Sequence, residues 1–351
     1  MTTGGKKERT LLVERAGPYT SIQDAGRPGY LSSGITEGGA ADQTAYREGL
    51  VLIGARDPLA CLEIFGMGGA YLIQGGDICA CLSGAPIPIT LDGQEVPHRT
   101  SFVMRDGQRL ELGVIRGGNI SYLTVGGGFD VPEVFGSRST HLRAGIGGLD
   151  GRVLRDGDVL PVGPAEIAET GLQLPDDEKT SDDTIRVMLS GQSHLFDDSE
   201  RARFLATPFK ITHELDRMGA RLEFNGDPFS PKPGPAIVSE SIVQGDIQIM
   251  GNGQPVVLLA DRQPTGGYPR IACVISADIA KFVQMQPGSV VRFELVEHGD
   301  AVAALRVQHE TLASLPDRLM RRVRSNDELA NMLSTNLISG AVADGDGLPW
   351  D

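Results

Sequence analysis

The sequence predicts a mainly β protein with a minor α content, built as two linked domains. A chain of 351 residues is longer than one ordinary domain and suits two domains of roughly 150 residues each. Its 46 glycines and 21 prolines indicate many tight turns between short elements. Short apolar or alternating runs recur between these turns, which favours strands over long helices.

The predicted strands are short runs that are apolar throughout or alternate in polarity, each bounded by polar turn residues or glycine. In the first half of the chain they lie at 11–13, 70–73, 78–82, 109–114 and 120–125. In the second half they lie at 209–212, 221–224, 256–260 and 271–275. Both halves of the chain are therefore predicted to be built from strands.

Helices are predicted to be few. An acidic N-cap precedes helix-forming residues at 42–53, after Asp42, and at 198–206, after Asp198. A third helix is predicted after Ser276, and beyond His298 two short helices in LASLPDRLMRRVRSNDELANMLSTNLISG, at 312–340. The last two carry a basic cluster, which we interpret as a solvated helix face, with a docking site as the alternative. The cluster consists of Arg318, Arg321, Arg322 and Arg324.

The domain boundary is predicted at the acidic segment PAEIAETGLQLPDDEKTSDD, which lies between Gly163 and Thr184 and lacks apolar periodicity. The predicted division is an N-terminal β domain at 1–165, a linker at 166–184, a C-terminal β domain at 185–298 and a helical extension at 299–351. Each β domain is long enough to bury a core of its own.

The composition argues for small-molecule chemistry. A net charge of -14 and a pI near 4.9 oppose binding to nucleic acid or to an anionic membrane. The four cysteines have no Cys-x-x-Cys spacing and are expected to be reduced thiols. Neither a signal peptide nor a membrane-spanning window is evident, which predicts a cytoplasmic protein.

The usual catalytic signatures are missing. The sequence has no phosphate-binding loop, no Gly-x-Ser-x-Gly, no His-Glu-x-x-His and no dinucleotide-binding glycine motif. The six histidines lack metal-ligand spacing, so each is interpreted as an ordinary hydrogen-bonded side chain and no bound metal is predicted. The chemistry must therefore be sought in polar residues held by glycine-rich turns.

The densest of these turns is DRQPTGGYPR, which lies between two predicted strands. Its glycines allow unusual backbone angles and close approach of a ligand, and its last arginine can hold an anion. The alternative is a hairpin loop whose polar groups only satisfy the turn. The candidate residues are Thr265, Gly266, Gly267, Tyr268 and Arg270.

A second candidate is HELDRMGARLEF, where Asp216 and Arg217 lie in a turn between two predicted strands. A carboxylate beside a fixed cation can accept a proton from a substrate N–H, and a guanidinium can stabilise an oxyanion. A structural ion pair that closes the turn is the alternative.

Two further polar stretches lie in the first half, SIQDAGRPG at 21–29 and GSRSTHLRAGIGG at 136–148. Local capping and turn closure explain them equally well. Their candidate residues are Gln23, Asp24, Arg27, Ser137, Arg138, Ser139 and Thr140.

These segments together resemble one family. TSIQDAGRPGYLSSGI, GGGFDVPEVFGSRST, GIGGLDGRVLRDGDVLPVG, DRMGARLE and the segment from SES to GGYPR match, in order, the biotin-dependent-carboxyltransferase-like subunits over residues 11–296. The family is also called allophanate hydrolase subunit 2 or the C subunit of 5-oxoprolinase, and includes an antagonist of the Kip kinase inhibitor. The sequence departs from the family pattern in TEGGAAD at 36–42 and at Leu215 and Pro264, which border the presumed site.

The resemblance implies two tandem cyclophilin-like β barrels and action on a small amide substrate. It implies a smaller partner of the allophanate hydrolase subunit 1 type, and leaves open a third, lactam-hydrolase subunit. ATP is expected at the level of the complex, and carboxybiotin, if used, would be supplied in trans, because the chain has no Met-Lys biotinylation dipeptide.

The resemblance also ranks the site residues. Asp216, Arg217 and Arg270 are expected to be catalytic, with Asp216 handling a proton or orienting the amide nitrogen and the arginines binding anionic groups. The other candidates are expected to bind substrate. Asp216 and Arg270 are the first residues to test.

Three functions follow from these observations. The leading hypothesis is a subunit of an ATP-dependent 5-oxoprolinase, which converts 5-oxoproline to glutamate. The second is carboxyl transfer from carboxybiotin to urea or a urea-like amide. The third is a non-catalytic binding antagonist of a kinase inhibitor, in which substitutions in the polar loops would be tolerated.

Overall fold

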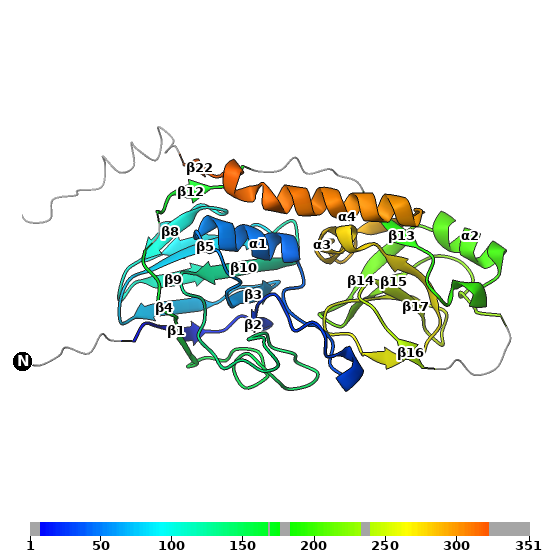
Figure 1. Cartoon of the computed structure of the whole chain (residues 1–351), viewed down its shortest axis with the longest axis horizontal. Helices are drawn as coiled ribbons and strands as arrows, with labels where there is room; N and C mark the ends of the chain where they lie inside the picture. The colour runs from blue at the N-terminus through cyan, green and yellow to red at the C-terminus, as the bar shows by residue number, and fades with distance from the viewer. Residues whose placement is uncertain (1–7, 168, 176–182, 233–238, 323–351) are drawn as a thin grey trace, which may run out of the picture.

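The computed structural model describes residues 8–167, 169–175, 183–232 and 239–322. Two β domains lie side by side along the long axis, and one helix, α4, runs across both of them (Figure 1). The prediction of a mainly β fold is confirmed, with two sheets in the first domain and a closed barrel in the second. The predicted domain boundaries themselves stay a prediction.

The first domain contains two antiparallel sheets that enclose one apolar core. The six-stranded sheet has the order β11-β1-β4-β9-β6-β7, and the five-stranded sheet the order β2-β3-β10-β5-β8. The strands are β1 (Thr10–Arg15), β2 (Thr20–Gln23), β3 (Cys61–Phe65), β4 (Ala70–Gln74), β5 (Ile78–Gly84), β6 (Ile89–Leu91), β7 (Gln94–Glu95), β8 (Ser101–Met104), β9 (Arg109–Leu112), β10 (Ile120–Val125) and β11 (Val159–Pro161).

Strand β10 is buried on both faces, and all six of its residues are inaccessible. One face packs on the core between the sheets, while the helix α1 (Gln43–Leu52) lies near the other face (Figure 1). This explains why ISYLTV does not alternate strictly between apolar and charged residues, since a strand covered on two sides has no need of an alternating pattern. Its three hydroxyl groups, on Ser121, Tyr122 and Thr124, are buried as well.

The second domain is a closed barrel of seven strands in the order β13-β20-β17-β18-β15-β14-β21. The pairing of β13 with β21 is parallel. Its strands are β13 (Thr184–Met188), β14 (Phe209–Leu215), β15 (Gly219–Glu223), β17 (Asp246–Ile249), β18 (Pro255–Leu258), β20 (Arg270–Val274) and β21 (Val290–Leu295). Two short pairs complete the strands, β12 (Leu172–Gln173) with β22 (Met320–Arg321), and β16 (Glu240–Ser241) with β19 (Thr265–Gly266).

Aromatic side chains fill one end of the barrel core. Phe204 stacks on Phe293 with ring centroids 5.1 Å apart, and Phe209 and Phe229 pack beside them. Phe204 lies on α2 (Asp198–Ala206), which therefore covers this end of the barrel. Offset and edge contacts of this kind stabilise a core beyond the area that they bury.

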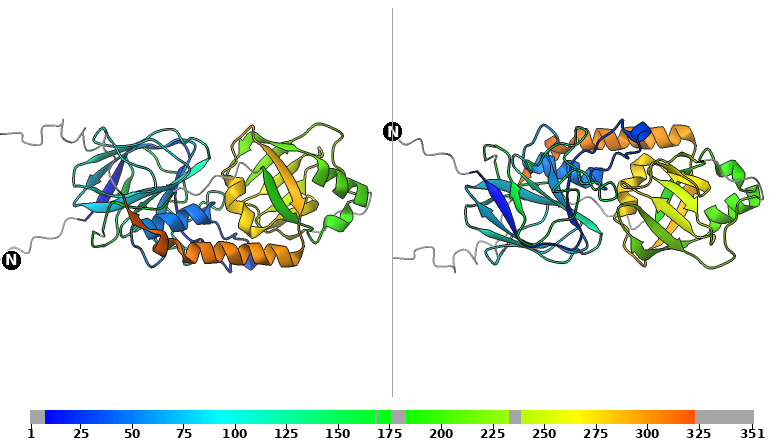
Figure 2. Two further views of the ribbon diagram at one scale, coloured as in Figure 1. Left: turned by 90° about the horizontal axis from the view of Figure 1, so that it is seen from above. Right: turned by 90° about the horizontal axis from the view of Figure 1, so that it is seen from below.

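The remaining helices are α3 (Ile279–Val283) and α4 (His298–Ala313), with single 3-10 turns at η1 (Leu31–Ser33), η2 (Ser193–Leu195), η3 (Ser276–Asp278) and η4 (Leu315–Arg318). The helices predicted at 42–53, at 198–206 and after Ser276 are confirmed. Figure 2 shows α4 lying along one side of both domains.

The two short helices predicted at 312–340 are not found up to residue 322, where the 3-10 turn η4 and the strand β22 follow α4, and residues 323–340 lie outside the described residues. One helix of 16 residues occupies His298–Ala313, because the run HGDAVAALRVQHETLA is rich in strong helix formers. Arg318 ends the following 3-10 turn and Arg321 lies in β22, so these two do not share a helix face. Arg324 lies outside the described residues.

No helix in the described part of the chain is both long enough and apolar enough to cross a lipid bilayer. The cytoplasmic location stays a prediction.

Candidate functional site

A buried ion cluster joins the two domains at Arg217, which lies in the turn between β14 and β15. Its guanidinium donates to both carboxylate oxygens of Asp261 at 3.0 and 2.8 Å, and to Oε1 of Glu63 on β3 at 2.5 Å. It also donates to the backbone oxygen of Gly39 at 2.8 Å. Burial by itself lowers the pKa of Arg217, but the two carboxylates more than offset this effect and raise it.

Glu63 connects this cluster to the interior of the first domain. Its Oε2 accepts hydrogen bonds from the Tyr122 hydroxyl at 2.7 Å and from the backbone N–H of Ala41 at 2.8 Å. The Tyr122 hydroxyl in turn accepts from the backbone N–H of Asp42 at 2.9 Å. Glu63 therefore fixes the end of the 36–42 segment and the Arg217 side chain together.

Arg27 lies beside this cluster and is 1% exposed. Its Nη2 donates to the backbone oxygen of Ser139, and its Nε to that of Val134 at 3.3 Å. Its Nη1 is buried and has no hydrogen-bond partner within the described protein. A buried donor without a partner is costly, so this N–H marks a place where an acceptor is needed.

Gly38 lies close to this N–H. A Cβ atom at Gly38 would lie 3.3 Å from Arg27 Nη1 and 3.7 Å from both Asp261 Oδ1 and Ser139 Oγ. Gly38 also has a φ of +59°, which disfavours other residues. A cation, a carboxylate and a hydroxyl thus lie around the Cα of Gly38, where a side chain would be in contact with all three. We call the group of Arg27, Gly38, Ser139, Arg217 and Asp261 the interdomain site.

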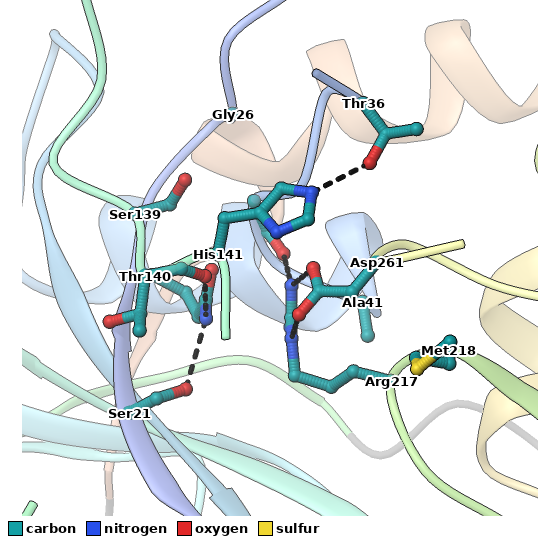
Figure 3. A network of polar contacts seen from close by, with 12 residues as sticks. Ser21, Gly26, Thr36, Ala41, Ser139, Thr140, His141, Arg217, Met218 and Asp261 are labelled. Carbon is teal, nitrogen blue, oxygen red and sulfur yellow. Dashed lines mark hydrogen bonds and ion pairs between the residues drawn. The ribbon is translucent and has the colours of Figure 1, made fainter. Parts of the chain in front are cut away.

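His141 lies beside the interdomain site (Figure 3). The backbone N–H of Ala144 donates to Nδ1 of His141 at 3.3 Å, so the neutral ring carries its proton on Nε2. That nitrogen donates to the Thr36 hydroxyl at 2.8 Å, and the hydroxyl donates to the backbone oxygen of Arg262 at 3.3 Å. His141 therefore ties the 36–39 segment to the second domain.

The pKa of His141 is lowered. Burial is the main cause, the charges of Arg27 and Arg217 act in the same direction, and the Asp261 carboxylate opposes them. The ring is therefore neutral at neutral pH and serves as a hydrogen-bond donor through Nε2.

The other predicted residues of the first domain hold the loops that carry Arg27 and Ser139. Asp24 accepts from the Ser137 hydroxyl at 2.7 Å and from the backbone N–H of Arg138 at 2.6 Å. Gln23 donates to the backbone oxygen of Thr140 at 3.0 Å. These hydrogen bonds join segments 21–27 and 137–140.

Arg138 contributes through its backbone. Its side chain turns toward solvent, where it pairs with Glu133 at 2.5 Å and Asp130 at 3.4 Å. Gln23 and Thr140 each have one buried side-chain oxygen without a partner. These atoms are acceptors that a bound polar group can reach only if the loops move, because both are fully buried.

A second polar cluster surrounds Arg270. Its guanidinium contacts Asp246 at 3.1 Å, Glu240 at 2.6 Å and Gln192 at 3.2 Å. Thr265 and Gly266 form β19, which pairs with β16, while the Tyr268 side chain is 45% exposed and Gly267 lies between them. All three guanidinium nitrogens of Arg270 have protein partners, so this arginine holds the 240–246 and 265–270 segments together.

Arg262 links the two clusters. Its Nη2 donates to Glu37 at 2.8 Å and its Nε to the backbone oxygen of Ile242 at 3.2 Å. Ile242 follows the segment that contacts Arg270. The interdomain site and the Arg270 cluster are therefore parts of one continuous polar network.

Asp216 has a different position. It is exposed, and its Oδ1 accepts from the backbone N–H groups of Met218 at 2.7 Å and Gly219 at 3.1 Å. This is the pattern of a side chain that closes a turn. Asp216 shapes the turn from which Arg217 extends.

Sequence reasoning missed Thr36, Glu63, His141 and Asp261. Glu63 lies in an apolar strand and carries no local signal. The pair Gly38–Gly39, between Glu37 and Asp42, is a signal that could have identified the 36–42 segment, because two adjacent glycines with positive φ mark a close backbone approach. Among the described residues no cluster of three or more metal-binding side chains is present.

The chain matches the family model described as carboxyltransferase domain, subdomain A and B, over residues 33–295. It belongs to the carboxyltransferase domain family. It is 37% identical over 312 residues to a protein named as the C subunit of 5-oxoprolinase from Escherichia coli, and the match covers 88% of this chain and 98% of that protein. A protein of the same name from Haemophilus influenzae is 35% identical over 290 residues, covering 83% and 92%.

More distant relatives are much longer proteins. The urea amidolyase of Saccharomyces cerevisiae is 27% identical over 340 residues, which cover 90% of this chain and 18% of the yeast protein. The crystal structure of the K. lactis urea amidolyase superposes with a TM-score of 0.78 at 25% identity, covering 92% of this chain and 21% of that one. The family predicted from the sequence motifs is confirmed.

Proposed function

We propose that this chain is the carboxyltransferase-like subunit of an ATP-dependent complex that opens the lactam of 5-oxoproline to give glutamate. The match to two bacterial proteins named as the C subunit of 5-oxoprolinase, over nearly their whole length, supports this proposal. Their name implies further subunits. We propose a smaller partner of the allophanate hydrolase subunit 1 type and a third, lactam-hydrolase subunit.

The observation that carries the proposal is the buried Nη1 of Arg27, which lacks a partner beside Gly38. When amide resonance is broken, negative charge develops on the amide oxygen. A donor fixed in a buried site stabilises that charge more than water does, because it needs no reorganisation. Arg27 would bind this oxygen, and the Ser139 hydroxyl would lie near it.

The neighbouring residues would hold Arg27 and its surroundings in place. Arg217 and Asp261 neutralise each other across the domain interface, and His141 fixes Thr36 two residues before Gly38. We therefore propose Arg27, rather than Asp216 or Arg270, as the residue that acts on the substrate. Asp216 makes the contacts of a turn residue, and Arg270 is fully paired within the protein.

ATP would act at the level of the complex and would supply the free energy for lactam opening. One buried guanidinium N–H can bind a single oxyanion or carboxylate. The described residues around it do not form a loop that could bind a triphosphate. The part of this chain is therefore to bind and polarise the amide.

Carboxyl transfer from carboxybiotin supplied in trans to a urea-like amide is the second candidate. It is favoured by the similarity to urea amidolyases and by a site that suits a carboxylate as well as an amide oxygen. A non-catalytic antagonist would have no use for an unpartnered buried donor, because that donor destabilises the protein.

The test is ATP hydrolysis stimulated by 5-oxoproline, measured on this chain co-expressed with its neighbouring subunits and on the same preparation without it. We expect Arg27→Gln to lower the stimulated rate about 100-fold, as for other oxyanion donors. Arg143→Gln is the matched control, since Arg143 is an exposed arginine of the same loop region.

Each outcome has a definite meaning. Stimulation that persists without this chain, or in Arg27→Gln, would reject the proposed role. Carboxylation of urea by carboxybiotin, with no stimulation by 5-oxoproline from an intact complex, would establish the second candidate. If the only activity found is binding of the partner, and every loop variant binds it as well as the wild type does, the antagonist function would be indicated.

A further inference from the structure

A cavity of about 900 Å³ lies between α1, α4 and the η3–α3 segment. It is outside the interdomain site, and its volume is within the range of small-molecule binding sites. Figure 1 shows α4 above α1 of the first domain and above α3 of the second, so that the cavity involves both domains and the helix that crosses them.

The wall of the cavity has an apolar floor and a basic rim. Leu50, Ile279 and Leu312 form part of the floor, while Arg47 and Arg56 lie at the exposed rim. On α1, Arg47 and Leu50 lie three residues apart and therefore share one helix face. On α4, Gln308 and Leu312 lie four residues apart and therefore also share one helix face.

The charge of the lining is unusual for this chain. No aspartate or glutamate lines the cavity, although the chain has 46 acidic residues and a net charge of -14. Within the described residues, Arg47 and Arg56 have no ion pair or hydrogen bond from their side chains. Two unpaired guanidinium groups above an apolar floor are complementary to a carboxylate attached to an apolar body.

We propose that this cavity binds a small organic carboxylate with an apolar chain. Its carboxylate contacts Arg47 and Arg56, and its chain lies on Leu50 and Leu312. This site goes beyond the proposed lactam chemistry, and it holds whether or not that chemistry is correct.

The cavity also touches the network that holds the interdomain site. Ala41 lines it, and the backbone N–H of Ala41 donates to the Glu63 carboxylate that pairs with Arg217. An occupant would therefore contact the end of the 36–42 segment and stabilise the contact between the domains. Because it binds the folded chain, it raises the Tm.

The test uses 8-anilinonaphthalene-1-sulfonate as a fluorescent amphipathic anion and sodium octanoate as its competitor, with this chain alone and no ATP. We expect saturable fluorescence that octanoate displaces, and a rise of Tm with octanoate. The double variant Arg47→Gln and Arg56→Gln should weaken octanoate binding at least about tenfold, the size expected for loss of a charge-assisted contact. Arg306→Gln, at an exposed arginine of α4 outside the cavity lining, should bind as the wild type does.

Leu312→Trp tests the cavity with both arginines intact, because the larger ring fills the floor and should abolish displacement by octanoate. Equal binding to wild type and double variant, competition by octanol as strong as by octanoate, or displacement by inorganic phosphate alone would each overturn the proposal. None of these results depends on lactam opening, so the two proposals fail separately.

Discussion

At the residue scale, the interdomain site consists of charges that compensate one another away from water. Arg217, Glu63 and Asp261 are all at most 9% exposed. Removing such charges from water is expensive, and their mutual attraction repays this cost only while every partner is present. The site therefore depends on residues that touch no substrate.

Glu63→Gln is predicted to destabilise the protein by roughly 3 kcal/mol, because it leaves the buried Arg217 with one carboxylate in place of two. The urea concentration at the unfolding midpoint measures this change. Glu214→Gln removes an exposed partner of Arg221 and should cost less than about 1 kcal/mol. Equal losses of unfolding free energy in the two variants would show that the buried ion cluster contributes no more to stability than an exposed ion pair does.

His141 is predicted to make stability depend on pH. Its pKa in the folded protein lies below the ordinary value of 6.5, so below that value the unfolded chain binds more protons than the folded chain. The stabilising contribution is present above pH 6.5 and is lost as the pH falls toward the lowered folded-state pKa. Urea unfolding at pH 7.5 and 5.5 should show a smaller difference for His141→Gln than for wild type. An unchanged difference would contradict the assignment.

At the scale of the element, α1 begins where the two domains meet. Asp42 is its N-cap, and its side chain accepts from the backbone N–H of Ala45 at 2.9 Å. The same carboxylate accepts from Gln284 of the second domain at 2.9 Å. Burial raises the pKa of Asp42, while these hydrogen bonds act in the opposite direction. One residue thus starts the helix and contacts the other domain.

Asp42→Ala is predicted to cost about 1 to 2 kcal/mol, because it removes the cap. Asp42→Asn keeps an acceptor for Ala45 and should retain most of the stability. Chemical denaturation of both variants measures the difference. If both lose the same amount, the charge of Asp42 matters more than its capping oxygen.

The strands β2, β3, β13 and β17 were not among the runs that the sequence predicted. Nine other strands and the first three helices were predictable from the sequence, since turn residues and apolar patterning act between neighbours in the chain. The region beyond His298 was not. There the helical run begins earlier than the segment to which the two helices were assigned, and it packs with no fully buried side chain of its own. Its position depends on α1 and η3 beneath it.

At the scale of the whole molecule, one of the apolar clusters extends across both domains, in addition to the core between the sheets of the first domain. The largest cluster contains Tyr46 and Ile120 of the first domain with Ile185 and Phe282 of the second. Polar contacts also cross between the domains. Gln284 of the second domain accepts from the backbone N–H groups of Asn119 and Ile120 of the first at 2.9 and 3.1 Å. The domains are therefore expected to unfold together.

Calorimetry is predicted to show one transition for the wild-type chain, with the calorimetric and van't Hoff enthalpies equal. Gln284→Ala removes four contacts across the boundary and should lower the Tm and broaden or split the transition. Gln286→Ala, which loses one contact to Gly118, is the control. Two separate transitions in the wild type would disprove the coupling.

The sequence by itself determined the mainly β class, the family and the loops in which polar groups gather, because strand patterns, turns and motifs are local in the chain. Only the tertiary structure decided which of these groups face one another. Arg217 pairs with Glu63, 154 positions earlier, and the free N–H of Arg27 faces Gly38 and Asp261. Such pairings depend on how segments far apart in the chain pack, and no property of the neighbouring residues specifies that packing.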